Sequence, residues 1–153
     1  MQPVDALIAH CRAHGMRMTV QRRAIFQYLW GNTKHPTAEE VFQAVQERYP
    51  GVSLATVYNT LETLTQMGEI QRLDLGGAAE RFDPDVRVHH HFTCSGCGQV
   101  LDYFAVLPED VFAGPPGARV DRVQLHAVGL CADCRKLPLP GGSAKSANPN
   151  LSS

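Results

Sequence analysis

Two Cys-x-x-Cys pairs constrain the fold of this chain of 153 residues more than any other feature of its sequence. They are Cys94-Ser-Gly-Cys97 and Cys131-Ala-Asp-Cys134, and 33 residues separate them. Two residues between thiolates let both sulfurs turn toward one ion, and two such pairs complete the tetrahedral set of four sulfurs that structural Zn²⁺ prefers. A single pair would leave a redox motif or incidental cysteines open. Two pairs favour a zinc site that joins the ends of a small subdomain.

The composition is that of an ordinary globular chain, with 44% hydrophobic and 19% charged residues. The net charge of −1 carries no global basic signature, so any surface for nucleic acid must be local. The N-terminus has no charged segment followed by an apolar run, and no apolar stretch reaches the ~18 residues of a membrane span. We therefore expect a cytosolic protein whose cysteines are reduced or bound to metal, with Cys11 in the core.

Amphipathic periodicity and capping residues predict four helices in the first half. They are expected over Val4–His14, after Thr19, after the capping box Thr37-Ala-Glu-Glu40, and over Leu54–Met67 behind Ser53. The expected buried positions are Val4, Leu7, Ile8 and Cys11; Ala24, Ile25, Tyr28 and Leu29; Val41, Phe42, Val45 and Tyr49; and Val57, Leu61 and Leu64. Period-two stretches over 69–75 and 78–83 then predict a hairpin. Helices followed by a hairpin favour a winged helix-turn-helix over a generic small α/β domain.

The outer face of the fourth helix is small, polar and largely uncharged. It carries Ala55, Thr56, Asn59, Thr60 and Thr63. Such a face can enter the major groove of DNA, where an amide reads adenine and methyl groups meet thymine. An ordinary solvated face is the alternative, although solvated faces usually carry more Lys and Glu.

A local basic patch supports DNA binding. The first 30 residues contain four arginines and one aspartate, a net charge of +3. Arg17 and Arg22 flank the start of the second helix and are candidates for phosphate or minor-groove contacts.

The second half begins after a hinge at Asp83-Pro84-Asp85. Strands are expected over 88–93, 99–103 and 119–128, with a short acidic helix near 108–112. Because side chains alternate along a strand, His89 and His91 share one face, and Asp102 lies on the neighbouring strand. Imidazoles with a carboxylate suit Mn²⁺, Fe²⁺ or Zn²⁺. A solvent-facing histidine run is the alternative.

Six segments of the chain together resemble the ferric uptake regulator (Fur) family. They are MRMTVQRRAI (16–25), HPTAEEV (35–41), SLATVYNTL (53–61), RFD (81–83), HxHFTCxxCG (89–98) and GLCxxC (129–134). The resemblance implies a metal-dependent, homodimeric transcriptional repressor that binds double-stranded palindromic operator DNA, with Tyr58 touching bases.

The expected fold is α+β. An N-terminal winged helix-turn-helix is expected over 1–84, and a small α/β dimerisation domain with a structural zinc site over 85–137. Residues 138–153 are rich in Pro, Gly, Ser and Asn and are expected to form a disordered tail.

The resemblance also implies a regulatory metal between the two halves. Carried over motif by motif, its ligands are expected to be His35, Asp83, His89, His91 and Asp102. The expected ion is Fe²⁺ or Mn²⁺.

Asp102 and Asn59 resemble the peroxide-sensing branch of the family, in which iron and peroxide oxidise a ligand imidazole. His35 and His89 are the candidates for that oxidation.

A further, auxiliary metal site is expected only in outline. His90 and Glu109 are candidate ligands, but Val123 occupies the position where the family has a histidine, and His126 comes three residues later. That offset places His126 on the other face of the strand.

Two other classes of function remain to be weighed against a repressor. An enzyme is disfavoured because neither an H-E-x-x-H motif nor a zinc-deaminase signature is present. A metal-buffering module without DNA activity is the second class. Within the repressor class, a regulator of iron, manganese or zinc uptake without peroxide sensing is the alternative.

Overall fold

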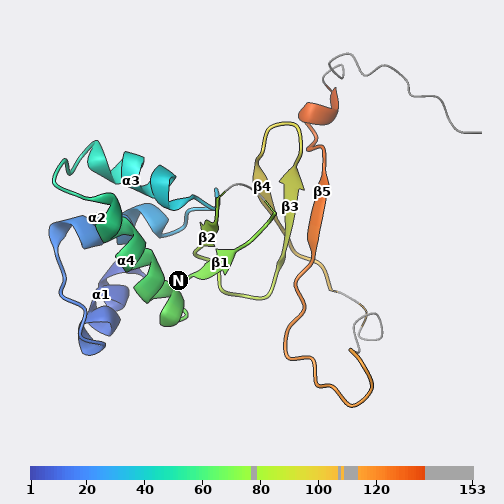
Figure 1. Cartoon of the computed structure of the whole chain (residues 1–153), viewed down its shortest axis with the longest axis horizontal. Coiled ribbons are helices and arrows are strands. Elements are labelled where there is room, and N and C mark those ends of the chain that lie inside the picture. The colour runs from blue at the N-terminus through green and yellow to red at the C-terminus, as the bar shows by residue number, and fades with distance from the viewer. Residues whose placement is uncertain (77–78, 107, 109–113, 137–153) are drawn as a thin grey trace, which may run out of the picture.

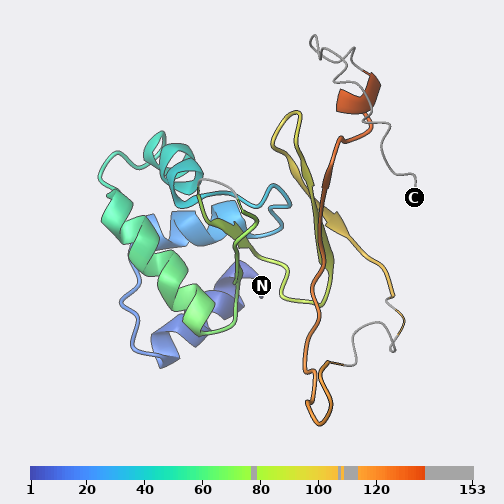
Figure 2. The same cartoon turned by 45° about the vertical axis from the view of Figure 1, so that its right-hand side comes forward.

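The computed structural model describes residues 1–76, 79–106, 108 and 114–136. The fold is α+β and has two lobes, which lie side by side in Figures 1 and 2. One lobe holds four helices and a two-stranded sheet, and we call it the helical lobe. The other is a three-stranded sheet, which we call the β-lobe.

Local capping chemistry sets where the helices begin. They are α1 Val4–Ala13, α2 Val20–Leu29, α3 Ala38–Gln46 and α4 Leu54–Gln66. The predicted caps are confirmed: Thr19 accepts from the amide of Arg22, and Ser53 from the amide of Thr56. Thr37 forms the predicted capping box with Glu40.

The core of the helical lobe is the apolar cluster formed by the inner faces of these helices. Val57, Leu61 and Leu64 are fully buried, as predicted, and Cys11 is a core residue. Four predicted positions, Val4, Tyr28, Phe42 and Tyr49, are only partly buried. Phe26, which was not among the predicted positions, is fully buried, because α2 contacts α1, α3 and α4 and so buries a wider face than one stripe.

Thr60 corrects the predicted outer face of α4. It is fully buried, and its hydroxyl donates to the carbonyl of Thr56 at 2.6 Å. A threonine can satisfy its hydroxyl within its own helix, so its polarity alone did not reveal which face it occupies.

The wing of the helical lobe is a short antiparallel pair. β1 Gln71–Leu73 pairs with β2 Arg81–Asp83, with Gln71 opposite Asp83. The predicted hairpin is confirmed, although its strands are shorter than expected and residues 77 and 78 lie outside the described part of the chain. Of the predicted hinge Asp83-Pro84-Asp85, Asp83 is the last residue of β2, and no helix or strand covers residues 84–89.

The β-lobe has the strand order β4-β3-β5. β3 His90–Cys94 is antiparallel to β4 Val100–Tyr103 and parallel to β5 His126–Gly129. The predicted strand over 119–128 is wrong for residues 119–125. The pairing with β3 starts at His126, opposite His91. Residues 119–125 come before it and have no neighbouring strand to complete a ladder. The predicted helix near 108–112 and the predicted tail fall outside the described residues.

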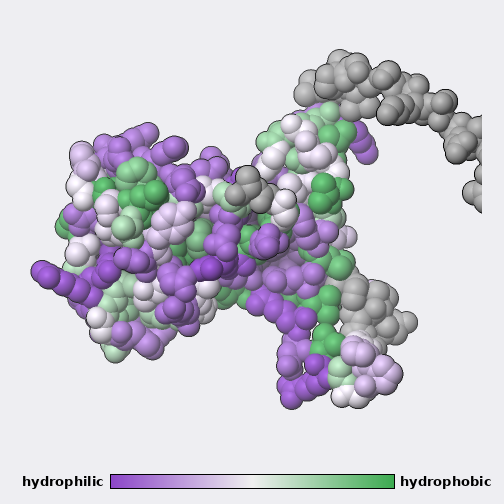
Figure 3. Space-filling view, viewed as in Figure 1, coloured by the Kyte–Doolittle hydropathy of each residue, from purple (hydrophilic) through white to green (hydrophobic). Residues whose placement is uncertain are grey.

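The β-lobe buries little apolar surface. Among its described residues, only Cys94 and Val100 are buried hydrophobics. The face drawn in Figure 3 shows several separate green patches along the sheet rather than one continuous apolar surface. A sheet of three short strands with so small a core needs a further source of stability. No helix of the described residues is long and apolar enough to span a membrane.

Candidate metal centres

Four thiols converge at one end of the β-lobe. Cys94 ends β3, Cys97 lies in the turn to β4, and Cys131 and Cys134 follow β5. Their ligand atoms all lie within 4.8 Å of one another, and the Sγ atoms of Cys97 and Cys131 are 4.0 Å apart. Zn–S bonds of about 2.3 Å in a tetrahedron place sulfurs roughly 3.8 Å apart, whereas a disulfide needs about 2.05 Å. This donor set therefore fits a tetrahedral zinc ion.

Two glycines shape the first thiol turn. Gly98 has φ +73°, a conformation that residues with a Cβ rarely adopt. At Gly96 a Cβ would lie 3.1 Å from the Sγ of Cys134 and from Leu130. The first cysteine pair therefore approaches the second closely because position 96 has no side chain.

Amide donors favour the thiolate form at one of these sulfurs. The amides of Cys131 and Cys97 donate to the Sγ of Cys94 and lower its pKa to about 6. Hydrogen bonding among the thiols, chiefly with Cys131, raises the pKa of Cys134 to about 12. A dication would remove this asymmetry, because it holds all four sulfurs as thiolates.

A second cluster, which we call the junction cluster, lies where the two lobes meet. Its ligand atoms also lie within 4.8 Å of one another, and its members are His35, Asp83, His89, His91 and Asp102. His35 precedes α3 and Asp83 ends β2, so these two come from the helical lobe. The other three come from the β-lobe, where His91 on β3 lies opposite Asp102 on β4. Both lobes therefore supply donors to one point.

The ligand atoms of this cluster lie close to one another, but several of them make no hydrogen bond. The Nε2 of His35 lies 2.7 Å from Asp102 Oδ1, and the Nε2 of His89 lies 3.0 Å from Asp83 Oδ2. Yet His35 Nε2, His89 Nε2 and Asp102 Oδ1 are buried and make no hydrogen bond. Two ligands of one ion at about 2.2 Å can be at most about 4.4 Å apart, so the cluster could close on an ion with shifts of a few tenths of an ångström.

The surroundings prepare these side chains as ligands. His89 Nδ1 lies 2.8 Å from the carbonyl of Arg87, and a proton donated there leaves Nε2 free to bind an ion. His35 has φ +50°, in the left-handed region that a non-glycine residue rarely adopts. Such strain persists where the surrounding structure holds it, and the Arg81 guanidinium donates to the His35 carbonyl at 2.9 Å.

Burial and hydrogen bonding favour the ligand forms of these groups. Burial lowers the pKa of His35, which keeps its imidazole neutral at pH 7. Burial works to raise the pKa of Asp83, but hydrogen bonds from His91, the Asp85 amide and Gln71 together hold that pKa below its usual value. Neutral imidazole and ionised carboxylate are the forms that bind cations.

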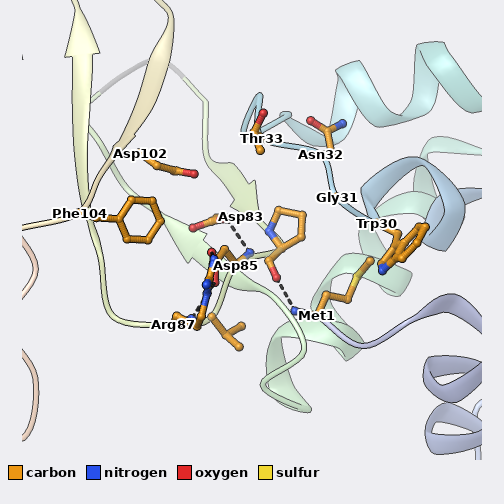
Figure 4. A pocket seen from close by; sticks show the side chains of 12 residues that line it. Met1, Trp30, Gly31, Asn32, Thr33, Asp83, Asp85, Arg87, Asp102 and Phe104 are labelled. Carbon is orange, nitrogen blue, oxygen red and sulfur yellow. Dashed lines mark hydrogen bonds and ion pairs between the residues drawn. The ribbon is translucent and has the colours of Figure 1, made fainter.

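A cavity of about 550 Å³ opens beside this cluster. Figure 4 shows the carboxylates of Asp83 and Asp102 on its wall, with Phe104 and Arg87 on the side of the β-lobe and Trp30 on the side of the helical lobe. The three imidazoles are at most 3% exposed. Asp83 is equally buried, at 2%, whereas the side chain of Asp102 is 18% exposed, so solvent reaches the cluster at Asp102.

His90 and His126 do not converge on a common point. In the parallel register His126 lies opposite His91, so it occupies the face of the sheet away from His90. His126 Nε2 lies 2.8 Å from the hydroxyl of Thr93, and His90 Nδ1 accepts from the amide of Leu125. This register agrees with the offset of His126 noted in the sequence, and Glu109, the third candidate ligand, lies outside the described residues.

The residues expected to contact DNA lie in the helical lobe, away from both clusters. Ala55, Tyr58, Asn59 and Arg17 are exposed, and Thr56 and Arg22 are half-buried. The guanidinium of Arg22 donates to the carbonyl of Arg17 at 2.6 Å. The hydroxyl of Tyr58 donates to Glu39 on α3, also at 2.6 Å.

Three neighbours of the second cluster were not predicted. Gln71 donates to Asp83, Phe104 stacks on His89, and the guanidinium of Arg87 lies over the Phe104 ring. Phe104 lies one residue beyond β4 and two after Asp102, so strand alternation continued by one residue would have placed both on one face. The role of Gln71 depends on the register of the wing, which the sequence did not fix.

A winged-helix lobe and a four-thiol β-lobe, with a histidine–carboxylate centre at their junction, define a two-lobed protein with metal-type sites. The chain belongs to the ferric uptake regulator family, whose model matches residues 13–107. It is 36% identical over 125 residues to the peroxide operon regulator of Bacillus subtilis, covering 80% of this chain and 86% of that protein.

Solved structures agree with this fold. The ferric uptake regulator of Helicobacter pylori, described as having three functional metal binding sites, matches with a TM-score of 0.74 over 89% of this chain and 96% of its own. Because the two sequences are only 18% identical, this match supports a shared fold and no shared function. The peroxide-sensing regulator PerR of Streptococcus pyogenes is 28% identical, with a TM-score of 0.52, over 88% of this chain and 94% of its own.

Proposed function

We propose that this chain is a homodimeric, metal-dependent transcriptional repressor that responds to peroxide. The observation that carries the proposal is the junction cluster, in which buried donors from both lobes face one point and several lack hydrogen-bond partners. We assign DNA binding to residues 1–84 and dimerisation to residues 85–137.

The junction cluster supports a geometric switch. Without an ion the segment over 84–89 lets the lobes change their relative position. With Mn²⁺ or Fe²⁺ bound, His35 and Asp83 are held against His89, His91 and Asp102, which fixes the separation of two winged helices in a dimer. Moving a two-state equilibrium from 1:99 to 99:1 requires about 5.5 kcal/mol of differential binding, which several metal–ligand bonds made in one state can supply.

The helical lobe supports DNA recognition by α4. Ala55, Tyr58 and Asn59 offer methyl, phenol and amide groups to the major groove of a palindromic operator. The first turn of α2 lies beside the loop before α4, since a Cβ on Gly51 would lie 3.8 Å from Gln21. This proximity supports our assignment of Arg17 and Arg22 to phosphate contacts near the same groove.

The outer face of the β-lobe supports dimerisation. Leu101 and Tyr103 alternate with Asp102 on β4 and so lie on the face away from the metal cluster. They are 37% and 55% exposed. A second copy of the chain would bury this face, which gives the lobe the apolar contact it lacks by itself.

The peroxide response follows from the chemistry of the junction. Bound Fe²⁺ would supply the electrons that activate hydrogen peroxide. The net change adds one oxygen atom to an imidazole carbon of His35 or His89 while peroxide is reduced to water. The oxidised imidazole is a poorer ligand, so the ion and the operator are released. The oxidation consumes a side chain of the protein itself, so the protein does not turn over as an enzyme does.

We further propose that the protein is cytoplasmic, because it would bind DNA and keep its thiols reduced or bound to metal.

The test is operator binding by zinc-loaded protein titrated with Mn²⁺, in gel-shift assays. His89→Ala and Asp102→Ala should abolish metal-stimulated binding and leave the four-thiolate zinc content unchanged. His14→Ala, at the exposed histidine that follows α1 as its C-cap, is the matched control. Metal dependence that survives both substitutions would refute the assignment.

The same preparation separates peroxide sensing from the alternative, an uptake regulator. After peroxide treatment of the iron form, mass spectrometry should find one added oxygen on peptides containing His35 or His89. Oxidation confined to methionine or cysteine, with metal-dependent operator binding retained, would leave a regulator of iron, manganese or zinc uptake.

A further inference from the structure

Gln71 lies at the point where the wing, the junction cluster and the β-lobe meet. It opens β1 and sits directly opposite Asp83 of β2, so the two side chains share one face of the wing. Its amide nitrogen donates to Asp83 Oδ2 at 2.7 Å and to the carbonyl of Asp85 at 2.6 Å. Its amide oxygen accepts from Arg122 at 2.8 Å and from Gln124 at 3.1 Å.

Only one orientation of this amide satisfies its neighbours. A guanidinium can only donate, and an ionised carboxylate or a carbonyl can only accept. The nitrogen of Gln71 must therefore face Asp83 and Asp85, and its oxygen must face Arg122. Both hydrogens and both lone pairs of the amide are used, so the side chain is held at each end.

The end that faces Asp83 orients an ion ligand. Asp83 Oδ2, the oxygen that Gln71 contacts, is also the oxygen nearest to His89 and His91, at 3.0 and 3.3 Å. Asp83 Oδ1 accepts from the Asp85 amide at 2.7 Å. Both oxygens of the carboxylate are thus aimed by neighbours, and removing such a partner typically costs 10- to 100-fold in metal affinity.

The other end reaches the opposite lobe without passing through any ion ligand. Arg122 and Gln124 belong to the segment that leads into β5, whereas Gln71 belongs to the wing of the helical lobe. The same amide therefore joins the two lobes that the ion is proposed to fix, and it adjoins the ligand that the ion would bind.

We infer that Gln71 is a positioning residue that couples ion binding at Asp83 to the arrangement of the two lobes. The inference rests on the proposed function. The two ends of the Gln71 amide have separate effects. The nitrogen sets the affinity of the site for the ion. The oxygen links occupancy of the site to the position of the winged helices, as a coupling free energy between metal and operator.

The experiment uses the full zinc-loaded chain and measures two quantities. Mn²⁺ affinity is read by competition with a chelator, and by the fluorescence of Trp30, which lines the cavity beside Asp83 and is the single tryptophan of the chain. The second quantity is the factor by which saturating Mn²⁺ raises affinity for the operator. Gln71→Leu removes both ends of the link, and the double change Arg122→Met with Gln124→Leu removes only the donors to its oxygen.

Gln71→Leu should weaken Mn²⁺ binding by about 10- to 100-fold. The double variant should bind Mn²⁺ like the wild type, yet Mn²⁺ should raise its operator affinity by a smaller factor. Gln66→Leu, the same chemical change at an exposed glutamine of α4, is the matched control and should change neither quantity.

Two results would overturn the inference. One is a Gln71→Leu protein with the Mn²⁺ affinity of the Gln66→Leu control. The other is a double variant that keeps the full metal-induced gain in operator affinity. If the wild type itself shows no metal-dependent operator binding, the proposed function fails, while the comparison of Mn²⁺ affinities still tests the role of Gln71 at Asp83.

Discussion

At the scale of single residues, His89 is buried beneath two layers of side chain. The ring of Phe104 stacks on it with centroids 5.2 Å apart and an interplanar angle of 27°. The guanidinium of Arg87 lies 5.7 Å from the centre of the Phe104 ring and is itself held by Asp85. Phe104 is 59% exposed, so this cover is thin. Access to His89, one candidate for oxidation, therefore depends on Phe104, which is not itself an ion ligand.

Phe104→Ala should uncover His89. In zinc-loaded protein without a second metal, diethyl pyrocarbonate should modify His89 severalfold faster than in the wild type, as measured by mass spectrometry of its peptide. Tyr103→Ala, on the opposite face of β4, should leave that rate unchanged. Equal rates in all three proteins would show that Phe104 does not shield His89.

At the scale of elements, α3 holds the exposed tyrosine of α4. Glu39 accepts the hydroxyl of Tyr58 at 2.6 Å, and this hydrogen bond raises the pKa of the phenol and lowers that of the carboxyl. Glu39 therefore remains ionised at neutral pH beside the proposed DNA-reading face. It orients the ring, but its charge opposes an approaching phosphate.

Glu39→Gln should tighten operator binding a few fold, because the amide still accepts the Tyr58 hydroxyl while the negative charge is gone. The gain should shrink as salt rises, since added ions screen the charge that was removed. Glu47→Gln, beyond the far end of α3, is the control for a change in net charge. Weaker binding by Glu39→Gln would mean that the carboxylate acts by some means other than repulsion.

The elements that could be predicted from the sequence were those fixed by local chemistry. Thr19, Thr37 and Ser53 cap their helices through side-chain oxygens that reach an amide three residues ahead, which any reader of the sequence can find. The strand expected over 119–125 failed because a strand needs a partner, and pairing is decided by the whole sheet. The role of Gln71 was missed for the same reason, since it follows from register.

At the scale of the whole molecule, the two lobes differ in what stabilises them. The helical lobe has a continuous apolar core, whereas the described β-lobe buries only Cys94 and Val100 as hydrophobic side chains. The ion ligands were assigned by resemblance to a family, and the fold brings all five to one point. The sequence could not show that several of their atoms lack hydrogen-bond partners, because that depends on how the lobes meet.

Removing zinc with a strong chelator under reducing conditions should unfold the β-lobe and leave the helical lobe folded. The far-UV circular dichroism of the helices should persist, and limited proteolysis should cut within residues 85–136 while residues 1–76 stay protected. Cysteine-to-serine changes at 94 and 97 should reproduce the effect. A chelated protein as resistant to protease as the zinc form would show that the β-lobe stands without its metal.

Strand β3 ends at Cys94 in the thiol cluster and begins one residue after His89 in the junction cluster, and His91 lies between them. This single strand of five residues thus carries ligands for both metal clusters. We therefore expect sequential loading, in which the four-thiol site is filled before the histidine–carboxylate site can form. On the proposed function, the protein should then respond to an ion at the junction only where zinc has already been supplied.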